Sequence, residues 1–182
     1  MMAELWDILD KNGSKTGRLH ERGKPLGPDD YFLFVHVWIL NDQGKFLLSK
    51  RAAEPIDKWH ITGGAAIAGD DSLTAALREA KEEIGIDLYP DSAQLYKRIT
   101  KASDIGGHNF SDIWLFRQQV DISKVILQPE EISDVMWADC EQIKQIIAQG
   151  DFAEPEKWYP YINEFLEQIA PENNTKPEGV GR

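Results

Sequence analysis

The segment from Tyr31 to Leu40 constrains the fold most strongly, because it is apolar along nearly its whole length. A strand that alternates apolar and polar residues has one buried face, whereas a continuously apolar strand is covered on both faces. The run is also half as long as a membrane-spanning helix needs to be. We therefore expect a strand inside a sheet that is sandwiched between helices, and no membrane association.

Shorter patterns predict the elements around this strand. Asn12-Gly13 provides turn chemistry for a hairpin over about 4–22. Further strands are expected over 45–50, 94–101, 110–120 and 135–138, and helices over 72–84, 140–149 and 155–169. This order predicts an α/β fold, an α/β/α sandwich around a mixed β-sheet. Residues 1–170 are expected to form one domain, and the polar tail 171–182 to be disordered.

The hydrophobic period changes from two to about 3.6 after Asp71, which predicts the helix over 72–84. Asp71 offers a capping oxygen at its start, and Gly85 is a natural C-terminal stop. Apolar residues recur on one stripe of this helix at i, i+4, i+7 and i+11: Leu73, Leu77, Ala80 and Ile84.

Carboxylates occupy a different face of the same predicted helix. Glu79, Glu82 and Glu83 span an arc of roughly 100° whose centre lies about 130° from the apolar stripe. Hard divalent cations prefer oxygen ligands of this kind, although a solvated acidic face is the commoner fate of a Glu-rich helix. Upstream, the pair Gly63-Gly64 permits close backbone approach to a ligand, and a carbonyl there can join a metal shell.

Composition narrows the classes of partner. The 182 residues include 20 Lys and Arg against 31 Asp and Glu, so the formal net charge is −11. Such an acidic surface repels phosphate backbones, and we expect no nucleic acid partner. The single cysteine, Cys140, rules out an internal disulfide and suits a reducing compartment. No secretory signal is visible at the N-terminus, so a cytoplasmic location is expected.

The stretch from Gly64 to Ile86 resembles the Nudix box, whose pattern is a glycine, five residues, an acid, seven residues, then Arg-Glu-apolar-x-Glu-Glu-x-Gly-apolar. Here it reads Gly64, Asp70 and then Arg78-Glu79-Ala80-Lys81-Glu82-Glu83-Ile84-Gly85-Ile86, with every spacing intact. Asp70 is the one departure, at a supportive position where the family usually has Glu. The resemblance implies a Nudix fold and a MutT-like, metal-dependent hydrolase of small-molecule diphosphates.

The resemblance also implies roles for individual residues. Mg²⁺ or Mn²⁺ would be the cofactor, and water would attack a phosphorus of a substituted diphosphate. Arg78 would orient the glutamates through a salt bridge, and Glu79 would be either a metal ligand or the base for the attacking water. The implied metal ligands come from the helix and from the glycine pair before it: Glu79, Glu82, Glu83, Gly63 and Gly64.

Residues outside the box carry weaker predictions. Trp59 and Phe110 lie closest to loops and are our candidates for stacking on substrate, with core packing as the alternative. Glu130 or Glu131 supplies a further acid near the metals, or else serves a cap or a solvated loop. His36 lies in the most apolar strand, where a satisfied core histidine is expected.

Two rival functions remain open. The run Trp6–Asp10 and the run Leu47–Arg51 are similar to isopentenyl-diphosphate isomerase and its Nudix relatives. That enzyme protonates an alkene with a cysteine placed just after the tryptophan-bearing strand, and here Trp59–Gly64 contains no thiol. Hydrolysis is therefore favoured over isomerisation. The second rival is a non-catalytic module that binds a pyrophosphate ligand, but such domains tend to lose the box glutamates.

The sequence leaves the substrate open. Nucleoside triphosphates, sugar nucleotides, dinucleotide cofactors and isoprenoid diphosphates all suit the box, since it recognises only phosphate and metal. Specificity is expected to come from the loops at 23–30, 51–58 and 101–110. The N-terminal hairpin provides an edge strand that is available for pairing across a homodimer.

Overall fold

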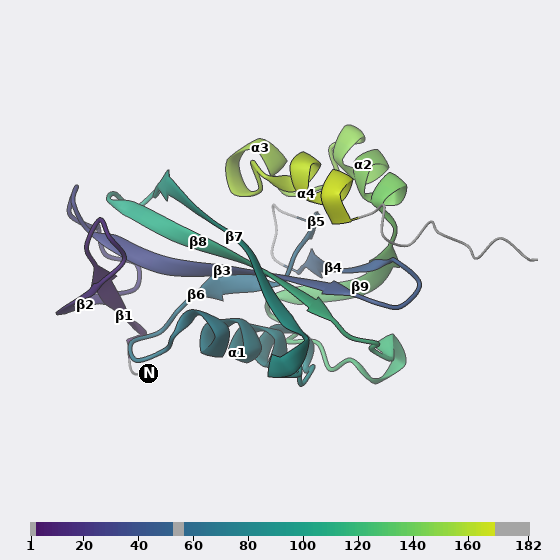
Figure 1. Cartoon of the computed structure of the whole chain (residues 1–182), viewed down its shortest axis with the longest axis horizontal. Coiled ribbons are helices and arrows are strands. Elements are labelled where there is room, and N and C mark those ends of the chain that lie inside the picture. The colour runs from purple at the N-terminus through teal and green to yellow at the C-terminus, as the bar shows by residue number, and fades with distance from the viewer. Residues whose placement is uncertain (1–2, 53–56, 170–182) are drawn as a thin grey trace, which may run out of the picture.

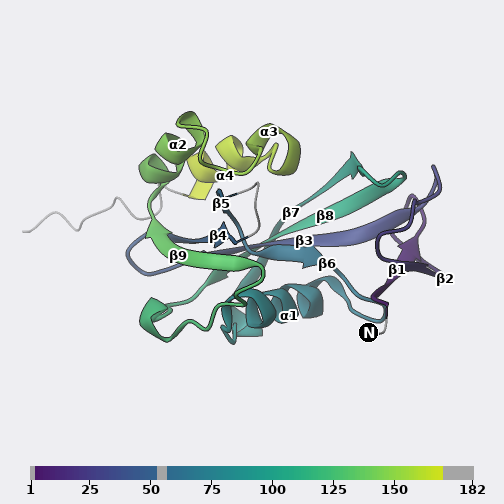
Figure 2. The same ribbon diagram turned by 180° about the vertical axis from the view of Figure 1, so that it is seen from behind.

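The computed structural model describes residues 3–52 and 57–169, so the tail 171–182, predicted to be disordered, lies outside the described residues. Within these ranges nine strands form one mixed sheet. Helix α1 (Ser72–Ile84) covers one face of the sheet, and α2 (Cys140–Ala148), α3 (Pro155–Trp158) and α4 (Ile162–Ile169) cover the other, as both views show (Figures 1 and 2). The predicted three-layer α/β/α architecture is confirmed.

Strand β3 (Tyr31–Leu40) is the centre of this sheet. It pairs in parallel along its whole length with β8 (His108–Arg117) and antiparallel with β6 (Gly63–Ala65) and β4 (Phe46–Arg51). Val35, Val37 and Ile39 pack in the cluster under α1, while Trp38 and Leu40 pack in the cluster under α2 and α4. Burial on both faces is the reason for its continuously apolar sequence.

The remaining strands extend the sheet on both sides. The β1–β2 hairpin occupies the region where the sequence predicts one, and it joins β3 through β1. Two strands, β5 and β6, were not predicted, because runs of two or three residues are too short to show a period. The other elements are β1 (Leu5–Leu9), β2 (Lys15–Glu21), β5 (Trp59–His60), β7 (Ala93–Ala102), β9 (Ile132–Ala138) and the 3₁₀ turns Pro90–Ser92 and Ile122–Lys124.

Helix α1 has the predicted bounds, and both of its ends are fixed by local chemistry. The Asp71 carboxylate accepts a hydrogen bond from the Thr74 amide at 2.8 Å. Gly85 ends the helix in the left-handed region with φ 66°, where a Cβ would come within 2.8 Å of the Ile126 carbonyl oxygen. Ser72 Oγ donates to the buried Asp112 carboxylate, which ties the first turn to β8.

The prediction of one continuous helix over 155–169 is wrong. Two helices form instead, and they are separated at Tyr159–Tyr161. Pro160 has no amide proton, and its ring disfavours helical geometry at the residue before it. Tyr159 accordingly has φ −129° and ψ 52°. None of the described helices is long and apolar enough to cross a membrane.

His36 is a buried, hydrogen-bonded histidine on β3. Its Nδ1 lies 2.7 Å from the Tyr161 hydroxyl, which also accepts a hydrogen bond from the Trp38 indole at 3.0 Å. Burial lowers the pKa of His36 to about 3, with a smaller contribution from the charge of Lys101. The imidazole is therefore neutral in the folded protein at neutral pH, as expected for a core histidine.

This burial predicts a specific sensitivity to acid. The unfolded chain protonates His36 below a pKa near 6.5 and the folded protein only near 3, so stability is lost as the pH falls through this window. A difference of one bound proton gives a slope of about 1.4 kcal/mol per pH unit. The free energy of unfolding, measured with urea at several pH values between 6 and 4, should therefore fall less steeply with decreasing pH for His36→Gln than for the wild type. Equal slopes for the two proteins would contradict this assignment.

Candidate active site

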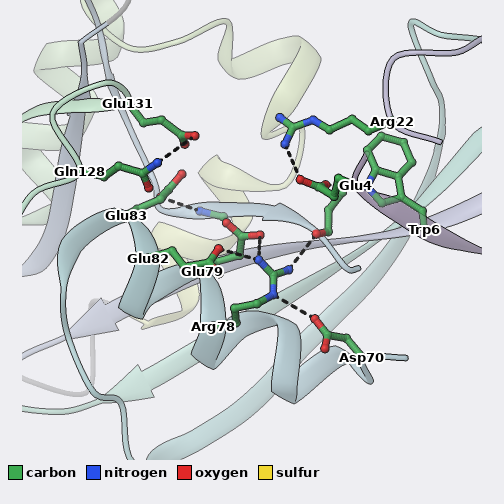
Figure 3. A network of polar contacts seen from close by, with 12 residues as sticks. Glu4, Trp6, Arg22, Asp70, Arg78, Glu79, Glu82, Glu83, Gln128 and Glu131 are labelled. Carbon is green, nitrogen blue, oxygen red and sulfur yellow. Dashed lines mark hydrogen bonds and ion pairs between the residues drawn. The ribbon is translucent and has the colours of Figure 1, made fainter. Parts of the chain in front are cut away.

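A cleft of about 990 Å³ lies between α1 and β6 on one side and the β1–β2 hairpin, the end of β7 and α3 on the other. Its walls carry all four residues that the sequence assigned to catalysis, together with Gly63 and Gly64. The close-up view shows that the acidic side chains of α1 point toward a common region beside β6 (Figure 3). The cleft therefore brings together Gly63 and Glu83, which are 20 positions apart in the sequence.

Two of the three helix glutamates are buried, so the solvated acidic face does not describe α1. Glu79 and Glu83 are 9% and 6% exposed, whereas Glu82 has a side chain 53% exposed. The helix packs through its small residues, since Ala75 and Ala76 are fully buried. This close packing carries the adjacent glutamates into the interior with the alanines.

Arg78 links the acids on α1 to each other (Figure 3). Its Nη1 donates to Glu79 Oε1 at 2.9 Å and to Glu82 Oε2 at 2.8 Å. Its Nε donates to Asp70 Oδ2 at 3.1 Å, and its Nη2 to the Ala65 carbonyl at 3.0 Å. The shorter acid at position 70 thus still reaches the arginine. These contacts provide the geometry that the predicted orienting role of Arg78 requires.

The glycine pair brings backbone close to the two buried carboxylates. The Gly63 amide donates to Glu83 Oε2 at 3.3 Å, and a Cβ on Gly64 would lie 2.5 Å from the Glu79 carboxyl carbon. Pairing of Gly63 and Gly64 with β3 fixes the position of β6 relative to these acids. A Cβ on Gly63 would also collide with the Val35 carbonyl. A side chain at position 63 would clash with backbone, and one at position 64 would displace the Glu79 carboxyl.

Burial makes negative charge unfavourable at these acids. It raises the pKa of Glu79 to about 7, although Arg78 acts in the opposite direction. Burial, together with the charges of Glu79 and Glu131, raises the pKa of Glu83 to about 8. Nearby cationic charge would favour the ionised forms of both side chains. A desolvated set of carboxylate and backbone oxygens fits a hard divalent cation.

The acids are not already arranged as a closed metal cage. Among the described residues, no group of three His, Cys, Asp or Glu side chains converges on one point. Arg78 engages one oxygen of Glu79 and one of Glu82. A cation bound here would draw on oxygens that these contacts leave available, and on water and substrate phosphate oxygens.

The loop before β9 contributes one acidic side chain to the cleft, together with Gln128. Glu131 lines it and accepts from the Gln128 amide group at 3.5 Å, while Glu130 is not part of the wall. The Gln128 backbone amide donates to the Glu83 carbonyl at 3.0 Å, which holds the loop against the end of α1. Of the two acids that the sequence proposes for this site, Glu131 lies in the cleft wall and Glu130 does not.

The two predicted stacking residues do not line the cleft. Trp59 packs beside the core with Lys50 Nζ 5.9 Å from its ring, and Phe110 is 6% exposed and stacks on Tyr31. Side chains alternate between the faces of a strand, so the adjacent residues His60 and Asn109 line the cleft instead. The aromatic rings that do line it come from other elements: Trp6, Phe32, Phe34, Trp158 and Tyr159.

The sequence reasoning also missed the contribution of the N-terminal hairpin. Glu4 accepts hydrogen bonds from the Trp6 indole at 2.8 Å and from Arg22 Nη1 at 2.9 Å, and all three residues line the cleft (Figure 3). They lie more than 40 residues before the box along the chain. No local pattern signals such a contact, because the sheet topology alone brings the hairpin to α1.

Removing one buried charge should stabilise the metal-free protein. In Glu83→Gln the side chain can still accept from Gly63, but it no longer carries a desolvated charge beside Glu79. At pH 8 without metal we expect its free energy of unfolding to rise by roughly 2 kcal/mol. Mg²⁺ should then raise the melting temperature of the wild type and not that of the variant. Glu82→Gln is the control, since its exposed carboxylate should give a much smaller metal-free gain, and a destabilised Glu83→Gln would contradict the account.

Gly64→Ala should damage the site through steric overlap. The new methyl group would displace the Glu79 carboxyl, and we expect Mg²⁺ affinity, measured by calorimetry, to fall by about tenfold or more. A double-mutant cycle provides the control. In Gly64→Ala/Glu79→Ala the methyl has space, so the added alanine at 64 should cost little further stability. A Gly64→Ala protein with unchanged metal affinity would show that the close approach is unimportant.

Comparisons with known proteins show which family the chain resembles. The NUDIX domain model matches residues 31–162. An uncharacterized Nudix hydrolase of Listeria innocua is 32% identical over 168 residues, which cover 90% of this chain and 94% of the relative. An isopentenyl-diphosphate Delta-isomerase of Citrobacter koseri is 23% identical over 84% of this chain and 87% of its own length.

A solved structure extends the likeness to the fold. A protein of Deinococcus radiodurans superposes with a TM-score of 0.65 at 19% sequence identity, covering 91% of this chain and 99% of that chain. The family model spans well over half of the sequence, and the Listeria relative matches nearly end to end. The chain therefore belongs to the Nudix family of hydrolases.

Proposed function

We propose that this chain is a Mg²⁺- or Mn²⁺-dependent hydrolase that splits the diphosphate linkage of a small organic diphosphate by water attack at phosphorus. The observation that carries the proposal is the burial of Glu79 and Glu83 side by side against the glycine strand β6, in the wall of a 990 Å³ cleft. Family membership adds weight, since the intact box is typical of its hydrolases.

The residues that would hold the cation are Glu82 and Glu83, with Glu79 as a further ligand or as the base. A backbone carbonyl of Gly63 or Gly64 would complete the set of metal ligands that the protein supplies. When bound, a divalent cation lowers the pKa of water and neutralises charge that develops on the phosphates. Glu131 is a further acid in the same wall, from a loop that is held to α1 through Gln128.

The chain itself supplies orientation. Arg78 bonds Glu79 and Glu82 and is anchored by Asp70 and by the Ala65 carbonyl, so both carboxylates keep fixed positions. Fixed geometry of this kind is worth more to a displacement at phosphorus than the strength of any one group. The Arg78 guanidinium donates to four oxygens of the protein itself, and we assign it a positioning role.

An isomerase is the second candidate, and the similarity to the Citrobacter enzyme is the observation that favours it. Isomerisation requires a group that can protonate the alkene. Cys140 does not supply it from the cleft, since its Sγ contacts the Leu166 carbonyl at 3.8 Å and the residue is absent from the described cleft wall. The intact glutamates of α1 favour hydrolysis.

The test is a hydrolysis panel in ¹⁸O-labelled water. Purified protein with Mg²⁺ or Mn²⁺ is offered a nucleoside triphosphate, a sugar nucleotide, a dinucleotide cofactor and isopentenyl diphosphate. We expect hydrolysis of at least one compound, with one ¹⁸O atom in a phosphate-bearing product. Glu82→Gln/Glu83→Gln should lower the rate by at least about a hundredfold.

The outcomes separate the candidates. Conversion of isopentenyl diphosphate to its isomer without phosphate release would support the isomerase and overturn the hydrolase. Metal-dependent binding without turnover of any compound would support the non-catalytic module. Hydrolysis that persists in the double glutamate variant would remove α1 from the mechanism.

A further inference from the structure

The floor of the cleft is a row of three side chains from neighbouring strands. Phe32 on β3 pairs directly with Asn109 on β8, which pairs directly with Lys101 on β7. Residues directly opposite each other in a sheet project from the same face. All three line the cleft, so this row faces the open space of the cleft.

Asn109 has an unusual environment for a buried amide. It is 4% exposed, and its Oδ1 is buried with no hydrogen-bond partner in the part of the chain that the structure describes. Buried acceptors are nearly always paired, because leaving one unpaired costs free energy. Since the residue lines the cleft, the missing donor can come from a molecule that occupies the cleft.

A second acceptor in the same condition lies on another wall. His60 is 6% exposed, and its Nδ1 lies 2.9 Å from the Ile61 carbonyl, to which it must donate. The neutral ring then presents Nε2 as an acceptor. This atom is also buried and has no hydrogen-bond partner among the described residues, and His60 lines the cleft. Asn109 Oδ1 and His60 Nε2 thus both lack a hydrogen-bond donor.

Lys101 adds a donor beside Asn109. Its Nζ donates to the Lys157 carbonyl at 3.3 Å and lies 4.6 Å from the Trp158 ring centroid. Within the described residues it forms no ion pair with a carboxylate, and burial lowers its pKa. An oxygen placed on the cleft floor next to Asn109 would therefore have a cationic donor within reach.

We propose that Asn109 and His60 determine specificity by accepting hydrogen bonds from hydroxyl or amino groups on the organic part of the substrate, with Lys101 donating to an oxygen beside Asn109. This assignment rests on the proposed diphosphate hydrolase function and narrows its substrate class. A group rich in hydroxyls, such as a sugar or nucleoside, satisfies both acceptors. A hydrocarbon group leaves both of them unpaired, so isoprenoid diphosphates are poor substrates.

The experiment compares Asn109→Leu with the wild type on ADP-ribose, UDP-glucose and isopentenyl diphosphate in Mg²⁺. For the hydroxylated compound with the best turnover, we expect KM to rise about tenfold and kcat to change less than twofold. Asn109→Asp keeps an acceptor oxygen at the same place and should restore most of the lost affinity. The wild type should prefer the hydroxylated compounds to isopentenyl diphosphate by kcat/KM.

Ser111→Ala is the matched control. Ser111 lies two residues along β8 from Asn109, is fully buried, and has an unpartnered Oγ, but it does not line the cleft. Its KM should stay at the wild-type value. If Asn109→Leu fails to fold, His60→Phe tests the second acceptor on its own, with the same expected rise in KM.

The results distinguish this inference from the proposed function. If the wild type hydrolyses nothing, the proposed function fails, and calorimetric binding of ADP-ribose and UDP-glucose decides the specificity site. Weaker binding by Asn109→Leu, with Ser111→Ala unchanged, upholds it. Equal binding or equal KM in the Asn109→Leu and wild-type proteins overturns it, as does a wild type that binds no hydroxylated compound or prefers isopentenyl diphosphate.

Discussion

The rest of the structure depends on the burial of two carboxylates, Glu79 and Glu83, on one helix. Taking a carboxylate out of water costs several kcal/mol unless cationic charge or hydrogen bonds compensate. Here the compensation is partial, since Arg78 bonds Glu79 and the Gly63 amide bonds Glu83, and both pKa values remain raised. A fold that keeps such an arrangement stores unfavourable energy that a bound divalent cation can release.

The surrounding elements are arranged to maintain that burial. The alanine face of α1 lets the helix lie close to the sheet, and the Ser72–Asp112 contact fixes its first turn on β8. β6 brings two glycines against the acids and is itself held by β3. The same long strand β3 continues past the glycines into the cleft floor, so one element supports both the acidic wall and the wall that we assign to specificity.

Much of this could be predicted from the sequence, for identifiable reasons. The bounds of α1 follow from its 3.6-residue period and its caps, and the box spacing places Arg78 and the glutamates on two successive turns of one side of the helix. The failures at the site concern the facing of strand residues and the contacts between distant segments. Trp59 and Phe110 each miss the cleft by one residue, because strand parity decides which neighbour faces a ligand. The contacts of Glu4 with the site depend on the sheet topology, and no local pattern encodes that.

The central claim is that the acids of α1 hold a divalent cation, and anomalous diffraction from crystals soaked in Mn²⁺ tests it most directly. The account predicts a manganese peak in the cleft, within coordinating distance of carboxylate oxygens of Glu82 and Glu83 and beside the glycines of β6. Loss of that peak in Glu83→Gln crystals would complete the evidence. A wild-type crystal without a peak at this position, or with manganese bound only elsewhere, would contradict it.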